Sequence, residues 1–320
     1  DHSVKLWENL SQELNYNMMF SQRGVMNLAH NEHDIKEMKR RISANRLNGL
    51  DTQWLETKEI KRLVPIMNTD NLRYPVLGAA YQPRGGVARH DAIAWGFAMR
   101  ADEMGVDIIQ NCEVQSIKTK NGKVEGVKTS KGFINAKKIA VVASGHTSVL
   151  AKTAGVRLPL QSRPLQALVS EPIKPVINTV VMSNAVHAYV SQSDKGELVI
   201  GGAPDSAQSF RRDIKQHVFE DTVGAMLELF PSFKKLKLLR QWGGHLDITP
   251  DASPIMDETS VPGLYVTAGW WGGYKAIPAG GLTMAHQVAT NSPHPLMETF
   301  SHNRFKNLDY ILETGTTTAR

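Results

Sequence analysis

The sequence contains a single cysteine, Cys112, among its 320 residues. One thiol excludes a disulfide within the chain and a cluster of thiolate metal ligands, and it is typical of proteins from a reducing compartment. Neither H-E-x-x-H nor C-x-x-C occurs, so the spacing of histidines and cysteines predicts no metal site. We therefore expect a cytoplasmic protein without a bound metal ion.

Long apolar runs are also missing. No stretch approaches the length of a membrane span, and the N-terminal DHSVKLWENL lacks the basic and then apolar pattern of a signal peptide. The formal net charge is +6 and the pI is about 9.3, but the basic residues are scattered. The densest group, at 36–46, follows Glu32 and Asp34 on a predicted helix, which favours a solvated face. We expect contact with neither membrane nor nucleic acid.

The motif G-x-G-x-x-G is absent from the chain. A dinucleotide site of the usual kind needs this loop after its first strand, because the glycines let the backbone approach the pyrophosphate. Either the protein binds no dinucleotide, or the chain begins after that motif. The abrupt start of the first predicted helix, at 2–15, favours the second interpretation.

Hydrophobic residues make up 41% of the chain and charged residues 21%, as in a soluble globular protein. Apolar residues at 91–104 cover nearly every side of a predicted helix, so we expect that helix to be buried. The region 106–145 predicts a strand at 106–114, hairpin turns at 121–122 and 131–132, and a strand at 138–144. A second β-rich block covers 158–204, and a helix covers 214–230. The alternation of these blocks predicts interleaved domains.

The stretch 261–290 gives the strongest local pattern. A buried strand at 263–267 precedes a loop with several glycines, and a helix begins near Pro278. This order lets bare backbone approach a planar or anionic ligand at a helix N-terminus. Lys275 is the one formal charge in the stretch. The glycines alone are equally consistent with a tight turn beside a solvated lysine, but the neighbouring Trp270, Trp271 and Tyr274 favour a binding role.

Three further side chains have local explanations. His90 stands at a predicted helix N-terminus, where local hydrogen bonding is the commonest role. Asp247 and Asp251 form a possible acid and base pair, although the intervening Pro250 favours a solvated turn.

Five segments of the chain resemble one protein family: FSQRGVMNLAH (20–30), RYPVLGAAYQPRGGVARHDAIAWGFA (73–98), EMGVDIIQNCEV (103–114), GHTSVLA (145–151) and GWWGGYKAIPAGG (269–281). They are similar to the β subunits of heterotetrameric sarcosine oxidases, in the D-amino-acid-oxidase-like flavoproteins. The resemblance implies an α/β fold. An FAD-binding doubly wound domain, incomplete at its N-terminus, would be interleaved with a mixed-sheet substrate domain. The expected FAD-binding parts are about 90–157 and 246–320, and the substrate-domain parts are about 16–89 and 158–245.

The resemblance also implies site residues. His90 matches the histidine that carries covalent FMN, and Val114 matches the residue whose backbone meets the FAD adenine. Gly145 lies in a second strand, glycine and helix step, and is assigned to the cofactor as well. The loop beside the flavin ring is matched by Gly272, Gly273 and Lys275, and Lys275 also matches the catalytic lysine that pairs with the substrate carboxylate. Arg89 and Arg240 are weaker candidates for the FMN neighbourhood.

The implied reaction is the oxidation of sarcosine to glycine, with electrons passing from non-covalent FAD to covalent FMN and then to oxygen. NAD and tetrahydrofolate would bind a partner subunit, and α, γ and δ subunits would complete the heterotetramer. A dimethylglycine-type dehydrogenase and a non-catalytic truncated subunit are the alternatives. The family's N-terminal strand, glycine loop and upstream substrate arginine have no match here. We therefore expect the isolated chain, as a fragment, to bind FAD weakly or not at all.

Overall fold

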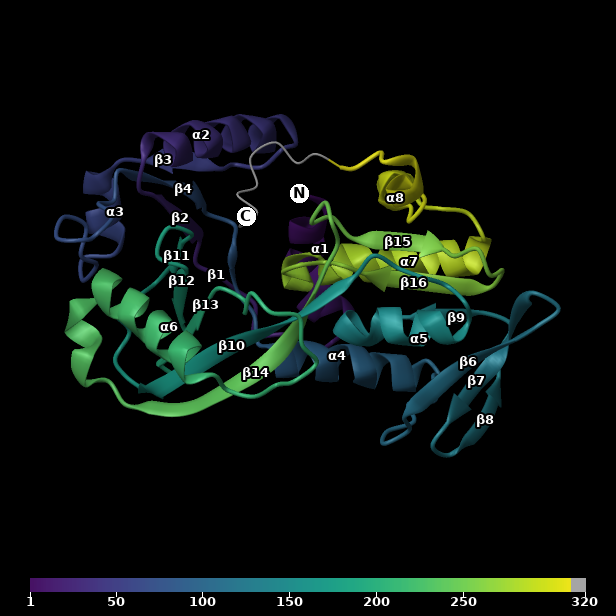
Figure 1. The fold of residues 1–320 in the computed structure, drawn as a ribbon. Helices are drawn as coiled ribbons and strands as arrows, with labels where there is room; N and C mark the ends of the chain where they lie inside the picture. Colours follow the sequence, from purple (N-terminus) through teal and green to yellow (C-terminus); the bar gives the residue numbers. More distant parts are fainter. Residues whose placement is uncertain (312–320) are drawn as a thin grey trace.

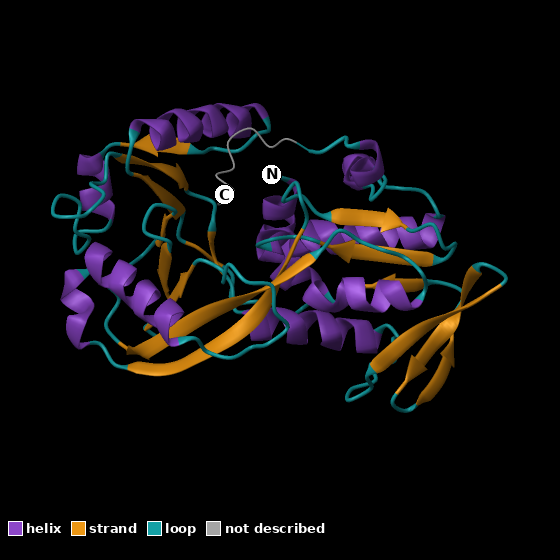
Figure 2. Ribbon diagram, in the orientation of Figure 1, coloured by secondary structure: helices purple, strands orange, loops and turns teal. Residues whose placement is uncertain are grey.

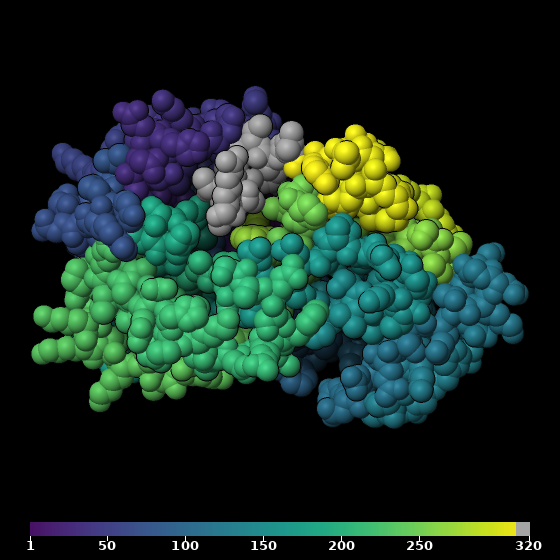
Figure 3. Space-filling model, viewed as in Figure 1, coloured from purple at the N-terminus to yellow at the C-terminus, as the bar shows by residue number. Residues whose placement is uncertain are grey.

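The computed structural model describes residues 1–311 and arranges them in two lobes built on separate sheets (Figures 1 and 2). The larger sheet lies on the left of Figure 1, and the smaller sheet lies between helices on the right. Figure 3 shows the early, purple segments at the upper left and the late, yellow segments at the upper right of one packed molecule. None of the helices within 1–311 has the length and apolar character needed to cross a bilayer.

The larger sheet is mixed and has eight strands. Strands β11 and β2 pair in parallel, and every other neighbouring pair is antiparallel. The predicted mixed sheet is therefore confirmed. In spatial order the strands are β14 (Leu238–Ile248), β10 (Gln161–Pro172), β13 (Glu197–Gly202), β12 (Ala188–Gln192), β11 (Val180–Ser183), β2 (Val25–Ala29), β4 (Gly78–Gln82) and β3 (Gln53–Leu55).

The two faces of this sheet differ because successive side chains on a strand point to opposite sides. Directly paired residues form a buried apolar row across five strands: Met26, Val181, Val190, Ile200 and Leu168. This row belongs to the main core, which is closed by α6 (Gln216–Leu229), α3 (Thr57–Leu63) and the 3-10 turn η2 (Pro231–Lys235). The adjacent row, Ser191, Val199, Val169 and Arg240, faces the opposite way.

The smaller sheet has three strands, with β16 (Leu264–Ala268) between β15 (Ile255–Glu258) and β9 (Ile139–Val141). Its β9 and β16 strands run parallel. Side chains of this sheet pack against α5 (Thr147–Thr153) through one cluster and against α7 (Ile277–Thr290) through another. The predicted strand, glycine loop and helix within 261–290 are therefore confirmed. The division of the chain into the two expected domains remains a proposal.

A third sheet consists of β6 (Val114–Lys120), β7 (Lys123–Thr129) and β8 (Gly132–Asn135). The predicted turn is confirmed, with φ at +51° for Asn121 and +76° for Gly122. The strand predicted at 106–114 is wrong over 106–113, where the backbone forms no ladder. Apolar character alone does not make a strand, because the backbone also needs a paired strand, and none of the strands within 1–311 pairs with 106–113.

Helix α4 (His90–Glu103) is less buried than its composition predicts. Only Ala92, Ile93 and Gly96 are buried, whereas Trp95 is 58% and Met99 is 48% exposed. The expectation of a fully buried helix is therefore wrong. Apolar composition fixes how much surface a helix can bury, and the elements around it decide how much is covered.

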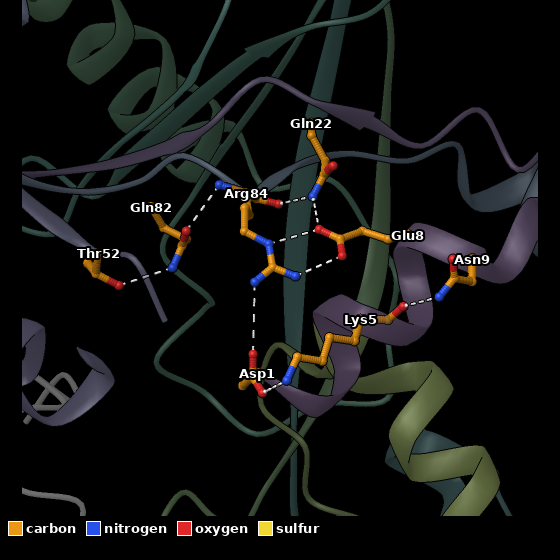
Figure 4. A network of polar contacts seen from close by, with 8 residues as sticks. All are labelled: Asp1, Lys5, Glu8, Asn9, Gln22, Thr52, Gln82 and Arg84. Carbon is orange, nitrogen blue, oxygen red and sulfur yellow. Dashed lines mark hydrogen bonds and ion pairs between the residues drawn. The ribbon is translucent and has the colours of Figure 1, made fainter. Parts of the chain in front are cut away.

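Helix α1 (His2–Glu13) packs beside α7 and is tied to the segment after β4 by a polar network (Figure 4). Arg84 donates two hydrogen bonds to the Glu8 carboxylate, at 2.9 and 2.7 Å. Gln22 donates to the same carboxylate at 2.7 Å and to the Arg84 carbonyl at 2.9 Å. Arg84 follows β4 and lies just before β5 (Gly86–Val87), which pairs with β1 (Ser21–Gln22). The network therefore ties α1 to the short antiparallel pair of β1 and β5.

We expect Arg84→Met to lower the free energy of unfolding by less than about 1 kcal/mol at pH 7, because salt and water screen partly exposed ion pairs. The hydrogen bond from Arg84 is the main cause that lowers the pKa of Glu8 below 4.5. A lowered carboxylate pKa stabilises the fold above the unfolded value, and this contribution is lost as the pH falls through the folded value. Urea unfolding at pH 7 and in acid measures the difference, which should shrink in acid.

Arg100→Met is the matched control, because Arg100 pairs with Glu103 on its own helix and joins no separate elements. An equal loss of stability for Arg84→Met at both pH values would contradict the role of the Glu8 charge.

The C-terminal part of the described chain is fastened by two aspartates, Asp251 with a buried side chain and Asp257 with a partly buried one. Asp251 accepts hydrogen bonds from Arg304 at 2.7 and 3.0 Å, and Asp257 accepts one from His302 at 2.8 Å. These contacts hold η4 (Pro295–Phe300) and α8 (Arg304–Asn307) beside β15.

The remaining helix, α2 (Glu32–Leu47), covers β2 and β4 of the larger sheet.

Candidate functional site

The loop after β16 begins at a glycine that no other residue replaces easily. Gly269 has a φ of +78°, and a Cβ there would lie 2.4 Å from the Thr249 side chain. Its N–H donates to the Asp247 carboxylate at 2.7 Å, and the Trp271 N–H donates to the Asp247 carbonyl at 3.2 Å. Asp247, at the end of β14, therefore ties the loop of the smaller lobe to the larger sheet.

This role corrects the expectation of a solvated turn at 247–251. Asp247 is only 5% exposed, and Asp251 forms a buried ion pair with Arg304. The two carboxylates have separate hydrogen-bond partners, and each acts as a structural acceptor.

The next two glycines have different surroundings. A Cβ at Gly272 would meet no heavy atom within 4 Å, so open space lies beside this backbone. A Cβ at Gly273 would lie 2.5 Å from the Trp270 side chain. Gly272 therefore offers bare backbone to a ligand, whereas Gly273 permits close packing. Gly272 precedes the short turn η3 (Gly273–Ala276), which begins at Gly273. The turn leads into the N-terminus of α7, where the helix dipole favours negative charge.

Lys275 lies on this turn and is exposed. Its Nζ donates to the Gly272 carbonyl at 3.0 Å. Its main-chain carbonyl accepts hydrogen bonds from the Ser3 hydroxyl at 2.7 Å and the Trp7 indole at 2.9 Å. Helix α1 therefore positions the lysine backbone, while the amine can reach a neighbouring anion. Sequence patterns gave no sign of this contact, because the partners are far apart in the chain.

His90 lies at the edge of a cavity of about 570 Å³ between the two lobes. It is exposed and is the first residue of α4. The opposite wall is the outward row of the larger sheet: Val169, Ser191, Val199 and Arg240, with Trp242 beside them. The structure therefore brings His90, Arg89 and Arg240 to one cavity, and their assignment to FMN remains a prediction. Lys275 does not line it.

The charge of this cavity is mixed. Arg23, Lys195 and Arg240 line it together with Arg89, and Asp194 and Glu197 are the acidic members. Arg23 pairs with Asp194, and Arg89 holds Asp91 through two hydrogen bonds. The Arg89 hydrogen bond is the main cause that lowers the pKa of Asp91. Cationic side chains beside an apolar wall suit a planar ligand that carries an anionic group.

The other expected cofactor residues lie apart from this cavity. Gly145 is buried in the turn η1 (Ser144–His146) after β9, where a Cβ would lie 3.0 Å from the Ser162 hydroxyl and 3.1 Å from the His245 Cβ. Val114 starts β6 in the three-stranded sheet and does not line the His90 cavity. The cofactor roles of both residues remain predictions.

The cavity beside His90 and the turn at Gly145 are the two places whose residues would hold a flavin. A volume of about 570 Å³ falls within the usual range for small-molecule sites, about 300 to 1,000 Å³. Beside Gly145, the buried Nε2 of His245 has no hydrogen-bond partner within the described residues, as expected where a polar ligand belongs. Across 1–311, no three His, Cys, Asp or Glu side chains are placed to hold a metal ion.

Comparison with known proteins gives one consistent result. Residues 1–287 match the family model described as FAD dependent oxidoreductase. The chain is 51% identical over 317 residues to sarcosine oxidase subunit beta from an Arthrobacter species, which covers 98% of this chain and 78% of the relative. It is 52% identical to the subunit of the same name from Rhodobacter capsulatus, covering 97% of this chain and 75% of that one.

The solved structures agree on the fold. L-proline dehydrogenase from P. horikoshii superposes with a TM-score of 0.90 at 26% identity, covering 97% of this chain and 83% of the other. Glycine oxidase from Geobacillus kaustophilus superposes with a TM-score of 0.84 at 21% identity, covering 95% and 81%.

Proposed function

The chain belongs to the FAD-dependent oxidoreductases, in the branch of the sarcosine oxidase β subunits, and from this membership we propose that it oxidises sarcosine to glycine. Membership makes it a flavin-dependent amine oxidoreductase. The choice of sarcosine rests on three relatives of that name, at 46 to 52% identity.

The observation that carries the proposal is the His90 cavity. A histidine at its edge, cationic side chains around it and the outward row of the larger sheet opposite would provide attachment, charge and a wall for FMN. His90 would carry FMN through a covalent bond, with Arg89 and Arg240 near its anionic group. FAD would lie against Gly272, Gly273 and Gly145, with its adenine near Val114. When bound, FAD and FMN would supply the two-electron redox chemistry for oxidation of the N-methyl group of sarcosine, with oxygen as the final acceptor and hydrogen peroxide as its product.

Lys275 is the proposed catalytic residue. Its ammonium would hold the substrate carboxylate through a charge-assisted hydrogen bond. For this it would either release the Gly272 carbonyl or use another of its three N–H donors. Fixing the carboxylate fixes the N-methyl carbon at the open backbone of Gly272, which converts a bimolecular encounter into an oriented one. The N-terminus of α7 adds partial positive charge on the same side.

The name of the relatives, subunit beta, supports assembly with other subunits. We propose α, γ and δ partners in a heterotetramer, with NAD and tetrahydrofolate on a partner. Tetrahydrofolate would take up the one-carbon unit that leaves the substrate.

Substrate profiling of the assembled, flavin-loaded enzyme tests the function. We expect sarcosine to give a kcat/KM at least about tenfold above that of dimethylglycine, because an added methyl group in a fitted pocket costs about 1 to 3 kcal/mol. Oxygen uptake and peroxide release measure the rates. A preference for dimethylglycine would favour the dehydrogenase alternative. Absence of turnover and of attached flavin would favour a subunit that only assembles.

A further inference from the structure

One side chain joins the loop that carries Lys275 to the segment that carries His90. The Tyr274 hydroxyl donates a hydrogen bond to the Ala88 carbonyl at 3.0 Å, across 186 residues of sequence. Tyr274 precedes Lys275, and Ala88 stands two residues before His90. The tyrosine therefore spans the space between the proposed FAD loop and the rim of the proposed FMN cavity.

Both ends of this bridge are held by the same small core. The Trp7 indole N–H donates a hydrogen bond to the Lys275 carbonyl at 2.9 Å. The centroids of the Trp7 and Tyr274 rings lie 6.1 Å apart. Ala88 packs against the cluster that contains Trp7 and Ile93. Each end of the bridge thus has a further contact with this core, and the Tyr274 side chain spans the distance between the two segments.

The phenol keeps its proton over the physiological range. Burial is the main cause that raises the pKa of Tyr274, and the nearby Asp91 carboxylate adds to it. The hydroxyl is therefore a donor to Ala88 at any pH at which the enzyme works. About two fifths of the residue stays exposed, at 41%, so the bridge borders open space and is not part of a closed core.

We propose that Tyr274 is a positioning residue that sets the spacing between the two flavin sites, and that it thereby supports electron transfer from FAD to FMN. This inference rests on the proposed function. Removing the hydroxyl frees the 86–92 segment from the Lys275 loop without touching His90 or Lys275. Because a net hydrogen bond contributes about 0.5 to 1.5 kcal/mol, the equilibrium constant in favour of the aligned arrangement should fall about two- to tenfold.

The experiment uses Tyr274→Phe in the assembled, flavin-loaded enzyme. Anaerobic stopped-flow absorbance separates FAD reduction by sarcosine from the later reduction of FMN. We expect the first step to stay within about twofold of wild type and the second to slow about two- to tenfold, the effect of one lost hydrogen bond. Hydrogen exchange, read by mass spectrometry, should quicken at 86–92. Acid-precipitated protein should retain its covalent flavin.

Tyr74→Phe is the matched control, because Tyr74 is 43% exposed, close to the 41% of Tyr274, and lines a different cavity. It should change neither step nor the exchange at 86–92. Unchanged FMN reduction and unchanged exchange in Tyr274→Phe would refute the spacer. An equal slowing of FAD reduction and FMN reduction would indicate a general structural role for Tyr274 and would also refute the spacer role. If the wild-type enzyme carries no attached flavin, the proposed role of His90 is wrong. The hydrogen-exchange result then decides by itself whether Tyr274 holds the 86–92 segment.

Discussion

Replacing His90 with alanine is expected to remove all flavin that stays with the protein after acid denaturation. In the proposed enzyme the imidazole is the covalent anchor of FMN, so its loss leaves only non-covalent contacts, which acid disrupts. The fold should persist, because His90 is exposed and the first turn of α4 keeps its hydrogen bond from the Ala92 N–H to Asp91 at 2.9 Å. Absorbance of the washed, redissolved pellet measures the attached flavin.

The control for this experiment is His33→Ala, since His33 is also exposed and also lies in the first turn of a helix, α2. It should keep the wild-type content of attached flavin. Yellow colour that remains covalently bound in His90→Ala would overturn the assignment. A folded His90→Ala protein without attached flavin is the expected outcome, and circular dichroism checks the fold.

For Lys275→Met we expect kcat/KM for sarcosine to fall about 10- to 100-fold, because a hydrogen bond to a charged group contributes about 1.5 to 3 kcal/mol. Methionine keeps the length and the apolar stem of the side chain, so the change removes mainly the ammonium. The main-chain contacts of residue 275 with Ser3 and Trp7 do not depend on the side chain and should persist. Initial rates over a range of sarcosine concentrations measure the effect.

Sarcosinamide, whose neutral amide replaces the carboxylate, separates substrate binding from general damage. If Lys275 pairs with the carboxylate, the ratio of wild-type to variant kcat/KM should be much smaller for the amide than for sarcosine. Lys58→Met, a change at an exposed lysine on α3, is the matched control and should leave both ratios near one. Equal losses for both substrates would contradict the proposed pairing.

Much of the fold follows from local patterns. Alternation along β10 and β13 and the apolar run of β16 predict strands that the structure contains, since period and β-branching act locally. The segment 106–113 has the same apolar character and forms no ladder, because a strand also depends on a neighbour that local sequence does not specify. Helix α4 was misjudged for a related reason. Its composition indicated burial, while Trp95 and Met99 are only about half covered by the rest of the described residues.

The same difference between local sequence signals and tertiary contacts applies to the candidate site. His90 and Lys275 were identified by resemblance, and the glycine loop was identified from its own pattern. Residue patterns alone favoured a solvated turn for Asp247, which in fact binds the Gly269 N–H. That contact depends on β14 ending beside the loop after β16, so only the tertiary arrangement reveals it. The bond from Tyr274 to Ala88 is a second example, since no local signal links two positions so far apart.

The path of the chain between the sheets has a consequence for how the protein acquires its structure. The parallel partner of β2, β11, lies beyond the whole of α4, β9 and α5, and the parallel partner of β9, β16, lies beyond β10 to β14. Neither sheet can be completed until distant segments meet, and closing such long loops is slow because the entropy is lost before the contacts form. A ribosome that has released only the first half of this chain therefore holds two unfinished sheets, and each waits for residues not yet synthesised.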